Sequence, residues 1–438
     1  MKILFISPAF ESNKSRGLKP FIYSYLYKIF LSPSLSFQIL AALTPYEYSI
    51  KYVNEEYKKI NFNEDCDLVG ITSTTINANH AYQIADEFRK RGVKVVIGGW
   101  HPSVLPNEAK EHADSVVIGE AEDIWPKLLR DFKNKDLKAI YKQNKPVDLN
   151  KIPFPDKKRL KYSEGLMVSG IQATRGCTKG CKYCSITNSP YGRIFRVRPI
   201  ESVIKEIGNI RQKILYFCDS SLTLNPEYSK ELFKSMIDLN KKFYCNGNID
   251  VLSSDEELIK LASKAGCVEW SIGFESISQK SLDFIGKKTN KVENFKSAIE
   301  KIHDHGMGIK GNFIFGFDED RLDIFTKTLD AIYDWKLDSA EFNILIPFPG
   351  TPLFKQLQKE QRILTYYWPL YDCSHVVFQP KHMTAQELLS GTIEINKKFH
   401  SKYNIINRSL NCFRHGFYSF LTTGVENIFK GLFHQNFN

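Results

Sequence analysis

Three cysteines, Cys177, Cys181 and Cys184, follow one another in a Cys-x3-Cys-x2-Cys pattern, directly after a segment from Val168 to Arg175 that predicts a strand. Protein iron–sulfur clusters are normally held by four thiolates, so a compact set of three leaves one iron of a four-iron cluster free to bind another ligand. An open coordination position is typical of catalytic metal sites. Structural zinc sites usually use two separated pairs, and a second pair is missing here. The pattern therefore favours a catalytic cluster over a zinc site or three buried cysteines.

The whole segment Arg175-Gly-Cys-Thr-Lys-Gly-Cys-Lys-Tyr-Cys184 resembles the signature of the radical SAM superfamily. The resemblance implies that the three cysteines ligate a [4Fe-4S] cluster, that the free iron chelates S-adenosylmethionine (SAM), and that Tyr183 lies near the adenine. Reduction of the cluster, expected from a flavodoxin- or ferredoxin-type donor, would then release a 5′-deoxyadenosyl radical that abstracts a hydrogen atom from an unactivated carbon. The protein's share is orientation and the exclusion of side reactions.

The composition is that of a globular protein, and 438 residues suffice for two or three domains. Nine cysteines, three of them committed to one cluster, indicate a reducing compartment, so we expect a cytoplasmic protein. The apolar start Met1-Lys-Ile-Leu-Phe-Ile6 is too short for a signal peptide and predicts a first strand. We find no apolar stretch long enough for a membrane span.

The formal net charge of +11 favours anionic partners, such as an acidic lipid, a phosphorylated substrate or an acidic electron donor. Lysine and arginine form no concentrated run, so nucleic acid is not an expected partner.

Residues 1–145 alternate apolar runs with helical patterns, which predicts an open parallel α/β sheet. Ligands of such sheets bind beyond the carboxyl ends of the strands. The expected strands are Ile3–Ile6, Ile50–Val53, Leu68–Thr72, Val93–Ile97 and Val116–Ile118, and the expected helices are Ser34–Leu43, Ala78–Arg91 and Glu120–Lys133. Their ends carry small or loop-forming residues, including Thr72, Ser73, Gly98, Gly99, His101, Gly119 and Glu120. These residues indicate either a ligand site or ordinary turns.

A sheet of this size before a radical SAM motif resembles the cobalamin-binding domain of class B radical SAM enzymes. The loops Val96-Ile-Gly-Gly-Trp-His-Pro102 and Val117-Ile-Gly-Glu-Ala-Glu122 carry the resemblance. It implies that the strand-end residues contact cobalamin. An Asp-x-His-x-x-Gly motif is absent, so no motif histidine ligates cobalt from below, and a domain that binds nothing is the alternative. His101 is a candidate lower ligand, although a loop histidine is more often structural.

Residues 146–166 contain three prolines among many charges and predict a linker. Residues 167–380 then repeat strand and helix units, which predicts a partial (β/α)6 barrel of TIM type. Its further strands are expected at Ile214–Asp219, Phe243–Asp250, Val268–Glu275, Ile309–Gly316 and Ala340–Ile346. The helices between them are expected at Tyr228–Lys241, Glu256–Ala265, Val292–His305 and Arg321–Trp335.

Side chains alternate between the two faces of each expected strand. One parity is polar: Asp219, Asn246, Asn248, Asp250, Glu269, Ser271, Glu275, Lys310, Asn312, Glu341 and Asn343. The other is largely apolar: Cys218, Ile249, Trp270, Ile272, Phe274, Phe313, Phe315, Phe342, Ile344 and Ile346. If helices cover the apolar face, the polar face lines a lumen that needs a polar ligand, and Cys218 and Cys245 are packing residues. An antiparallel sheet with one wet face is the alternative.

The family resemblance implies roles within that lumen. Ser271-Ile-Gly-Phe-Glu-Ser276 is similar to the segment whose acidic residue holds SAM, which implicates Glu275 with Ser276 beside it. The stretch from Asn312 through Gly316 to Glu319 resembles a strand near the adenine, with an asparagine in place of the first glycine. Asp219 takes the place of residues that bind the methionyl amine.

Residues 381–438 predict a helical extension. Apolar residues recur there at helical spacing with basic residues among them, as in a helix that lies on a membrane surface or one that packs on its own domain. They are Phe413, Phe417, Phe420, Leu421, Val425, Ile428, Leu432 and Phe433, with Arg414 and Lys430. The hypothesis is a peripheral contact with the inner face of the membrane.

Together these features predict a radical SAM enzyme in which cobalamin carries a methyl group to an unactivated carbon of a small molecule or lipid. No catalytic side chain is assigned beyond the cofactor ligands. One alternative is a cyclase, a rearrangement or carbon–carbon bond formation on a lipid or tetrapyrrole-like substrate without methylation. Another is a corrinoid or iron–sulfur binding protein without turnover.

Overall fold

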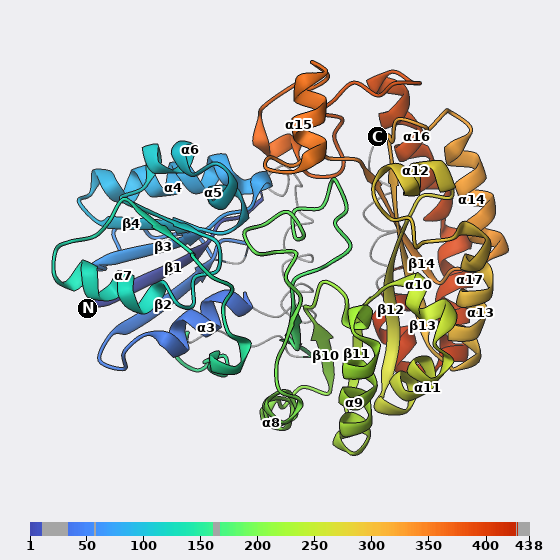
Figure 1. Cartoon of the computed structure of the whole chain (residues 1–438), viewed down its shortest axis with the longest axis horizontal. Coiled ribbons are helices and arrows are strands. Elements are labelled where there is room, and N and C mark those ends of the chain that lie inside the picture. The colour runs from blue at the N-terminus through green and yellow to red at the C-terminus, as the bar shows by residue number, and fades with distance from the viewer. Residues whose placement is uncertain (11–33, 57, 161–166, 426, 428–438) are drawn as a thin grey trace.

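The computed structural model describes residues 1–10, 34–56, 58–160, 167–425 and 427. Its first unit is a six-stranded parallel sheet in the order β2-β1-β3-β4-β5-β6 (Figure 1). The strands are β1 (Lys2–Ser7), β2 (Ser49–Asn54), β3 (Leu68–Thr72), β4 (Lys94–Gly98), β5 (Ser115–Ile118) and β6 (Ile140–Lys142). The helices are α3 (Leu35–Leu43), α4 (Ala78–Lys90), α5 (Trp100–Val104), α6 (Pro106–His112) and α7 (Trp125–Lys133).

Helices cover both faces of this sheet. Leu4, Ile6 and Val69 pack on one face with α4 and α6, whereas Ile3 and Phe5 pack on the other with α3 and α7. The predicted open parallel α/β sheet is therefore confirmed. The helix expected from Glu120 begins only at Trp125, with a proline in its first turn, because residues 119–124 form a loop. The short α5, α6 and β6 were not predicted.

The second unit is a six-stranded parallel sheet in the order β14-β13-β12-β11-β10-β7. The strands are β7 (Val168–Ile171), β10 (Ile214–Phe217), β11 (Lys242–Gly247), β12 (Cys267–Glu275), β13 (Gly308–Phe315) and β14 (Ser339–Ile344). The helices are α8 (Ile200–Asn209), α9 (Pro226–Met236), α10 (Ile249–Ser254), α11 (Glu256–Ala265), α12 (Gln279–Phe284), α13 (Phe295–Asp304) and α14 (Ile324–Asp334). This arrangement is the predicted partial (β/α)6 barrel. The two-residue strands β8 (Thr174–Arg175) and β9 (Arg196–Val197) pair antiparallel beside it.

The alternation predicted for β12, β13 and β14 is confirmed. Trp270, Phe313 and Phe342 lie in the core beneath the helices, and Ser271 and Asn312 are half-buried on the opposite face.

Two face assignments at the ends of β10 and β11 were wrong. Strand β10 ends at Phe217, which is buried in the helix-side core, so the half-buried Cys218 does not belong to that layer. Cys245 does pack there, as predicted. Asp250 lies on α10 instead of β11, because that strand ends at Gly247. Both errors arise because the expected strands were extended beyond the last ladder residue.

The chain that leaves β14 packs against the first unit before it returns to the barrel. Ile346, Phe354 and Trp368 join the core that α4 forms with the first sheet. This segment contains α15 (Pro352–Lys359) and the 3₁₀ turn η6 (Trp368–Leu370). The first unit is thereby fixed to the barrel through a shared apolar core.

In its described residues the C-terminal extension is helical, as predicted. It contains α16 (Ala385–Phe399), α17 (Lys402–Cys412), the 3₁₀ turn η7 (Phe413–His415), α18 (Phe417–Ser419) and the π-helical turn η8 (Phe420–Gly424). It reaches the amino ends of the barrel strands, where the Thr423 hydroxyl donates to Glu269. The predicted residues Ile428, Lys430, Leu432 and Phe433 lie outside the described residues.

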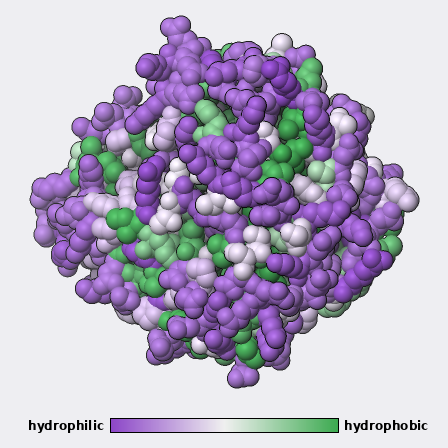
Figure 2. Space-filling view, turned by 45° about the vertical axis from the view of Figure 1, so that its right-hand side comes forward, coloured by the Kyte–Doolittle hydropathy of each residue, from purple (hydrophilic) through white to green (hydrophobic). Residues whose placement is uncertain are grey.

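The face seen in Figure 2 is largely hydrophilic, with apolar residues in scattered patches. Among the described residues, none of the helices combines the length and the apolar character that crossing a membrane requires.

Candidate functional site

The cysteine loop follows β8 and is held by backbone and side-chain hydrogen bonds. The amide of Cys177 donates to the Gly192 carbonyl at 2.8 Å. The Asn188 side chain donates to the carbonyls of Cys181 and Cys184 at 3.0 and 2.7 Å. At Gly176, where φ is +92°, a Cβ would clash with the Ile194 carbonyl, so the turn into the loop requires glycine.

The three thiols fit an iron cluster. All are free, and Cys177 and Cys184 lie close enough to Cys181 to influence its titration. Burial raises the pKa of Cys181 to about 12, and it also raises the pKa of Cys184. Thiolates in such surroundings need a cation beside them, and iron supplies that charge.

A charged pair lies beside these thiols. Glu275, at the end of β12, has a φ of +64° and accepts a hydrogen bond from Lys287 at 2.6 Å. Lys287 also donates to the Gly273 carbonyl at 3.0 Å. A Cβ on Gly273 would clash with the Glu275 carboxylate, so glycine gives the acid its room.

Burial alone would lower the pKa of Lys287, but the carboxylate of Glu275 outweighs burial and raises this pKa. Burial, with the charge of Glu275, raises the pKa of Tyr183 well above its ordinary value. The structure thus brings together Tyr183, Glu275 and the cysteines, as predicted, and adds Lys287. Sequence reasoning missed Lys287 because a single lysine in a loop carries no distinguishing pattern.

The lumen beside this pair is polar and partly open. Asn312 donates from its amide to Ser271 Oγ at 3.1 Å and to the Ile272 carbonyl at 3.3 Å. Lys310 pairs with Glu341 at 2.7 Å. Such half-buried donors and acceptors suit a polar ligand such as SAM.

Ser276 and Gly316 are placed differently from this lumen face. Ser276 is buried, and its hydroxyl accepts from the amide of Ser278 at 3.1 Å. The Gly316 amide donates to Asp320 at 3.0 Å, and a Cβ on Gly316 would meet Leu388. The contacts of Ser276 and Gly316 are therefore with the protein itself, at the ends of β12 and β13.

Asp219 supports the segment that leads into the cysteine loop. It is fully buried, and its carboxylate accepts from the Ala173 amide at 3.1 Å and from the Thr174 hydroxyl at 2.6 Å; the Thr174 amide also donates to it. Burial raises the pKa of Asp219 to about 6. These contacts support a positioning role instead of the expected bond to the methionyl amine.

The carboxyl edge of the first sheet carries the residues expected to contact cobalamin. Thr72, Gly98 and Gly119 are half-buried at this edge, whereas Ser73 is buried and its amide donates to the Gly98 carbonyl at 2.8 Å. At Gly99, with φ at +108°, a Cβ would clash with the Ser73 carbonyl. Tight packing of neighbouring loops thus explains this glycine, and the small residues leave the edge open.

His101 is fully buried and both ring nitrogens are engaged. Nδ1 lies 3.2 Å from the Thr75 hydroxyl and Nε2 lies 3.0 Å from Glu108. The ring of His101 is therefore engaged within the first unit and does not reach the open edge. The preceding residue, Trp100, fits cobalamin better, because its indole nitrogen is buried and has no partner among the described residues. An amide of a corrin side chain would satisfy it.

Glu120 does not point to a free edge either. It receives two hydrogen bonds from Arg196, at 2.6 and 2.8 Å, and lies 3.5 Å from Arg175. Arg175 also pairs with Glu122 at 2.8 Å. Burial alone would raise the pKa of Glu120, but the hydrogen bonds and charges of Arg196 and Arg175 outweigh burial and lower this pKa. We call these four residues, Glu120, Glu122, Arg175 and Arg196, the clamp.

The clamp joins the loops at the carboxyl ends of the first sheet to the segment that carries the cysteines. Its acids follow β5, and Arg175 stands two residues before the first cysteine. After β14, Gly350 lies against Val104, which follows β4. The carboxyl ends of both sheets therefore face one another.

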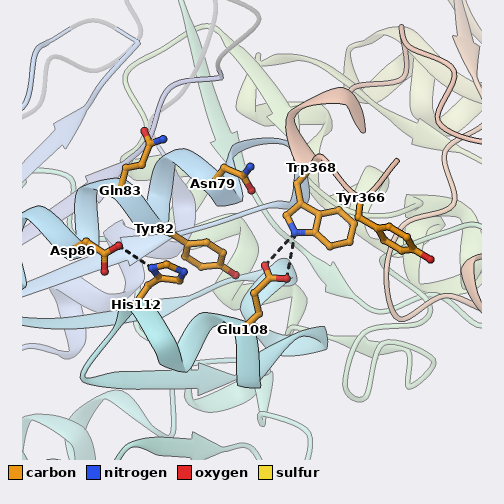
Figure 3. A pocket seen from close by; sticks show the side chains of 8 residues that line it. All are labelled: Asn79, Tyr82, Gln83, Asp86, Glu108, His112, Tyr366 and Trp368. Carbon is orange, nitrogen blue, oxygen red and sulfur yellow. Dashed lines mark hydrogen bonds and ion pairs between the residues drawn. The ribbon is translucent and has the colours of Figure 1, made fainter. Parts of the chain in front are cut away.

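A pocket of about 360 Å³ is lined by α4, α6 and the chain after β14, with Tyr82, Glu108 and Trp368 among its residues (Figure 3). Its acids are already engaged: Asp86 bonds to His112 at 2.8 Å, and Glu108 bonds to the indole of Trp368 at 3.1 Å. These contacts join α4 and α6 to the chain after β14. The pocket belongs to the packing between the units.

Residues 171–332 match the radical SAM superfamily, and residues 55–129 match the B12 binding domain. The chain is 33% identical over 355 residues to the bacteriochlorophyllide d C-12(1)-methyltransferase of Chlorobaculum tepidum, which covers 78% of this chain and 76% of the relative. It is 24% identical over 444 residues to an anaerobic magnesium-protoporphyrin IX monomethyl ester cyclase of Cereibacter sphaeroides, covering 92% and 71%.

Several solved structures share the fold, two of them with a SAM analogue or SAM bound. The radical SAM methyltransferase TsrM from Kitasatospora setae, with tryptophan and aza-SAM bound, has a TM-score of 0.65 at 16% identity and covers 82% of this chain and 76% of its own. The cobalamin-dependent enzyme OxsB, with aqua-cobalamin and SAM, has a TM-score of 0.68 at 14% identity, covering 98% and 72%. The chain therefore belongs to the radical SAM superfamily, in the group with an N-terminal B12-binding domain, whose cofactors are a [4Fe-4S] cluster, SAM and cobalamin.

Proposed function

We propose that this enzyme transfers a methyl group to an unactivated carbon of a small molecule. The observation that carries the proposal is that the carboxyl ends of the two sheets face one another. The clamp holds them in this arrangement through contacts of 2.6–2.8 Å. Bound cobalamin would supply a transferable methyl group, and the cluster with SAM would supply the radical. Methyltransferases at 33% identity are consistent with this chemistry.

Each part of the chain then has a task. The three cysteines hold the cluster, and Glu275, fixed by Lys287, orients SAM beside it. Asn312 and Lys310 line the lumen into which SAM and the substrate enter. Trp100, Thr72 and Gly98 receive cobalamin at the opposite edge. We propose residues 1–145, 167–380 and 381–438 as the cobalamin domain, the barrel and the extension, with 146–166 as the linker.

The substrate class to test first is a chlorin, a ring of the tetrapyrrole type. Two relatives at 33% identity are named for bacteriochlorophyllide d, and the net charge of +11 favours a substrate with acidic side chains. A flavodoxin- or ferredoxin-type protein is the proposed reductant.

The test uses anaerobically purified enzyme with a reconstituted cluster and cobalamin. After addition of SAM, a strong reductant and a bacteriochlorophyllide d-type chlorin, mass spectrometry follows 5′-deoxyadenosine, S-adenosylhomocysteine and the substrate. We expect both nucleoside products and a substrate heavier by one methylene, and loss of all three in Cys181→Ala. The same enzyme without cobalamin is the matched control.

5′-Deoxyadenosine without S-adenosylhomocysteine would instead support the cyclase or rearrangement alternative, for which the cyclase relatives provide precedent. Neither product, with an intact cluster and several chlorins tried, would favour a binding protein.

We also propose a peripheral contact with an anionic lipid surface through α17 and the turns after it. Five large apolar side chains recur there at helical spacing, and each is at least 49% exposed: Tyr403, Ile406, Leu410, Phe413 and Phe417. Ile406→Ser/Leu410→Ser should abolish sedimentation with phosphatidylglycerol vesicles, whereas Leu322→Ser/Leu364→Ser, at 52% and 53% exposed sites elsewhere, should not. Equal sedimentation of both double variants would contradict this contact.

A further inference from the structure

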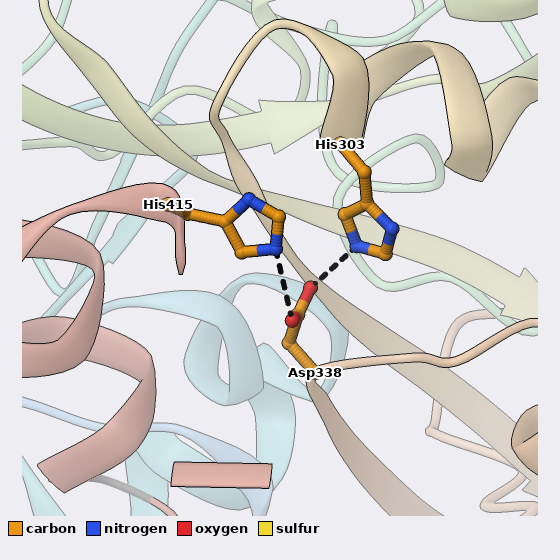
Figure 4. A group of neighbouring side chains, drawn as sticks. All are labelled: His303, Asp338 and His415. Carbon is orange, nitrogen blue, oxygen red and sulfur yellow. Dashed lines mark hydrogen bonds and ion pairs between the residues drawn. The ribbon is translucent and has the colours of Figure 1, made fainter. Parts of the chain in front are cut away.

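Two histidines and an aspartate from distant parts of the chain meet at the amino ends of the barrel strands (Figure 4). His303 lies in the last turn of α13, Asp338 directly precedes β14, and His415 ends η7 in the C-terminal extension. One ligand atom from each of the three lies within 4.8 Å of the others. The cysteine loop is at the opposite ends of the strands, so this cluster is separate from the cofactor site.

The geometry is close to that of a metal site. Nε2 of His303 is 2.8 Å from one oxygen of Asp338, and Nε2 of His415 is 3.6 Å from the other. Both nitrogens point to the carboxylate in Figure 4, and the ring centroids are 4.8 Å apart. Tetrahedral zinc with bonds of about 2.0–2.2 Å places its ligand atoms roughly 3.3–3.6 Å apart. The two separations run to different oxygens of the carboxylate; that of 3.6 Å falls within this range, and that of 2.8 Å is shorter.

Further hydrogen bonds fix the position of Asp338, as is usual for metal ligands. Asp338 is 4% exposed, and its Oδ2 accepts a hydrogen bond from the Ile309 amide at 2.9 Å. Asn427 donates to the Asp338 carbonyl at 2.8 Å. A nearby buried cation, Arg408, is positioned over the ring of Phe399 at 3.6 Å, and its guanidinium nitrogens have no hydrogen-bond partner among the described residues. The two histidines therefore remain as the side chains paired with Asp338.

We propose that His303, Asp338 and His415 bind a divalent transition-metal ion of the zinc class, which ties the C-terminal extension to the base of the barrel. Two imidazoles and one carboxylate are ligands that zinc accepts, and water completes the shell. The ion has a structural role: it replaces the contact between one carboxylate and two imidazoles with three metal bonds. The proposal does not depend on the methyltransferase reaction.

The test measures zinc on full-length protein with its cluster reconstituted, so that the cysteines are occupied by iron. After incubation with Zn²⁺ and removal of the excess, elemental analysis should find about one zinc per chain beside the cluster iron. His415→Gln and His303→Gln should each lower zinc at least about tenfold and leave the iron unchanged. His305→Gln is the matched control, because His305 lies two residues away and bonds to the Lys301 carbonyl.

X-ray absorption at the zinc edge on the unaltered protein provides a readout that needs no variant. Nitrogen and oxygen ligands at about 2.0–2.1 Å, without sulfur, are expected. Sulfur at about 2.3 Å would place the zinc on cysteines and overturn the proposal. No zinc beyond the cluster site, or equal zinc in His415→Gln and the unaltered protein, would overturn it as well and leave the three residues as an ion-pair network.

Discussion

At the residue scale, the cofactor site depends on charges that are compensated inside the protein. The side chains of Lys287 and Glu275 are 12% and 8% exposed, so neither charge is stabilised mainly by water. A buried ion pair contributes modestly as a pair, but removal of one partner leaves a charge whose burial is unfavourable.

Lys287→Met should therefore lower the free energy of unfolding by about 3 kcal/mol. Adding Glu275→Gln should recover much of that loss, because the unpaired carboxylate is then neutral. Denaturant unfolding of the cluster-free protein measures both changes. The reconstituted double variant should still produce 5′-deoxyadenosine at least about tenfold more slowly, because SAM is no longer oriented.

Lys288→Met is the matched control for this comparison, because Lys288 is the exposed neighbour. If Lys287→Met is no more destabilising than Lys288→Met, the pair does not contribute as described.

At the scale of elements, the turn after β13 is fixed by one carboxyl group. Asp320 accepts hydrogen bonds from the amides of Gly316 and Phe317, both at 3.0 Å, and from the Ser281 hydroxyl at 3.1 Å. Burial raises the pKa of Asp320 to about 6. The folded state thus holds this proton more tightly than the unfolded chain, so stability is lost as pH rises from about 4 to about 6.

Between pH 5 and pH 7.5, the unaltered protein should lose about 1 kcal/mol of stability relative to Asp320→Asn. Unfolding midpoints of the cluster-free proteins at the two pH values measure this difference. Asp323→Asn should show no such change, because Asp323 is exposed and Lys327 lowers its pKa. The absence of any difference would mean that Asp320 is ionised throughout this range.

The sequence predicts the elements of both units well, because parallel strands covered by helices have strong local patterns. The alternation in β12 and β13 even identified the lumen face, where Ser271 and Asn312 lie. Prediction was weakest at the ends of strands, because the alternation of side chains stops there. The candidate site residues lie at these ends. Asp219 lies just beyond β10, and its contacts with Ala173 and Thr174 depend on a segment that lies 45 and 46 residues earlier in the sequence.

Contacts between distant segments could not be predicted for the same reason. Glu120 and Glu108 carry no local sign that their side chains bond to Arg196 and Trp368. The family resemblance located the loops correctly but could not orient these side chains. Only the folded chain decides which polar residues face a ligand and which face one another.

At the scale of the whole molecule, the clamp links the cluster loop to the cobalamin edge. SAM cleavage takes place within the barrel, whereas methyl transfer needs both edges in register. The side chains of the two acids and two arginines of the clamp are between 13% and 17% exposed, so water screens their charges less than those of surface pairs. A misplacement of about 1 Å can reduce a transfer rate by up to roughly a hundredfold.

Arg196→Gln should therefore lower the methylated product formed per 5′-deoxyadenosine at least about tenfold, while the rate of 5′-deoxyadenosine formation changes little. The charge-reversed pair Glu120→Arg/Arg196→Glu should restore part of the ratio, because the contact across the two units re-forms. Lys94→Gln is the control, since Lys94 pairs with Asp114 within the first unit at 2.7 Å. Equal losses of both products would place Arg196 in cluster binding instead, and an unchanged ratio would mean that the shared core around Trp368 aligns the two edges without the clamp.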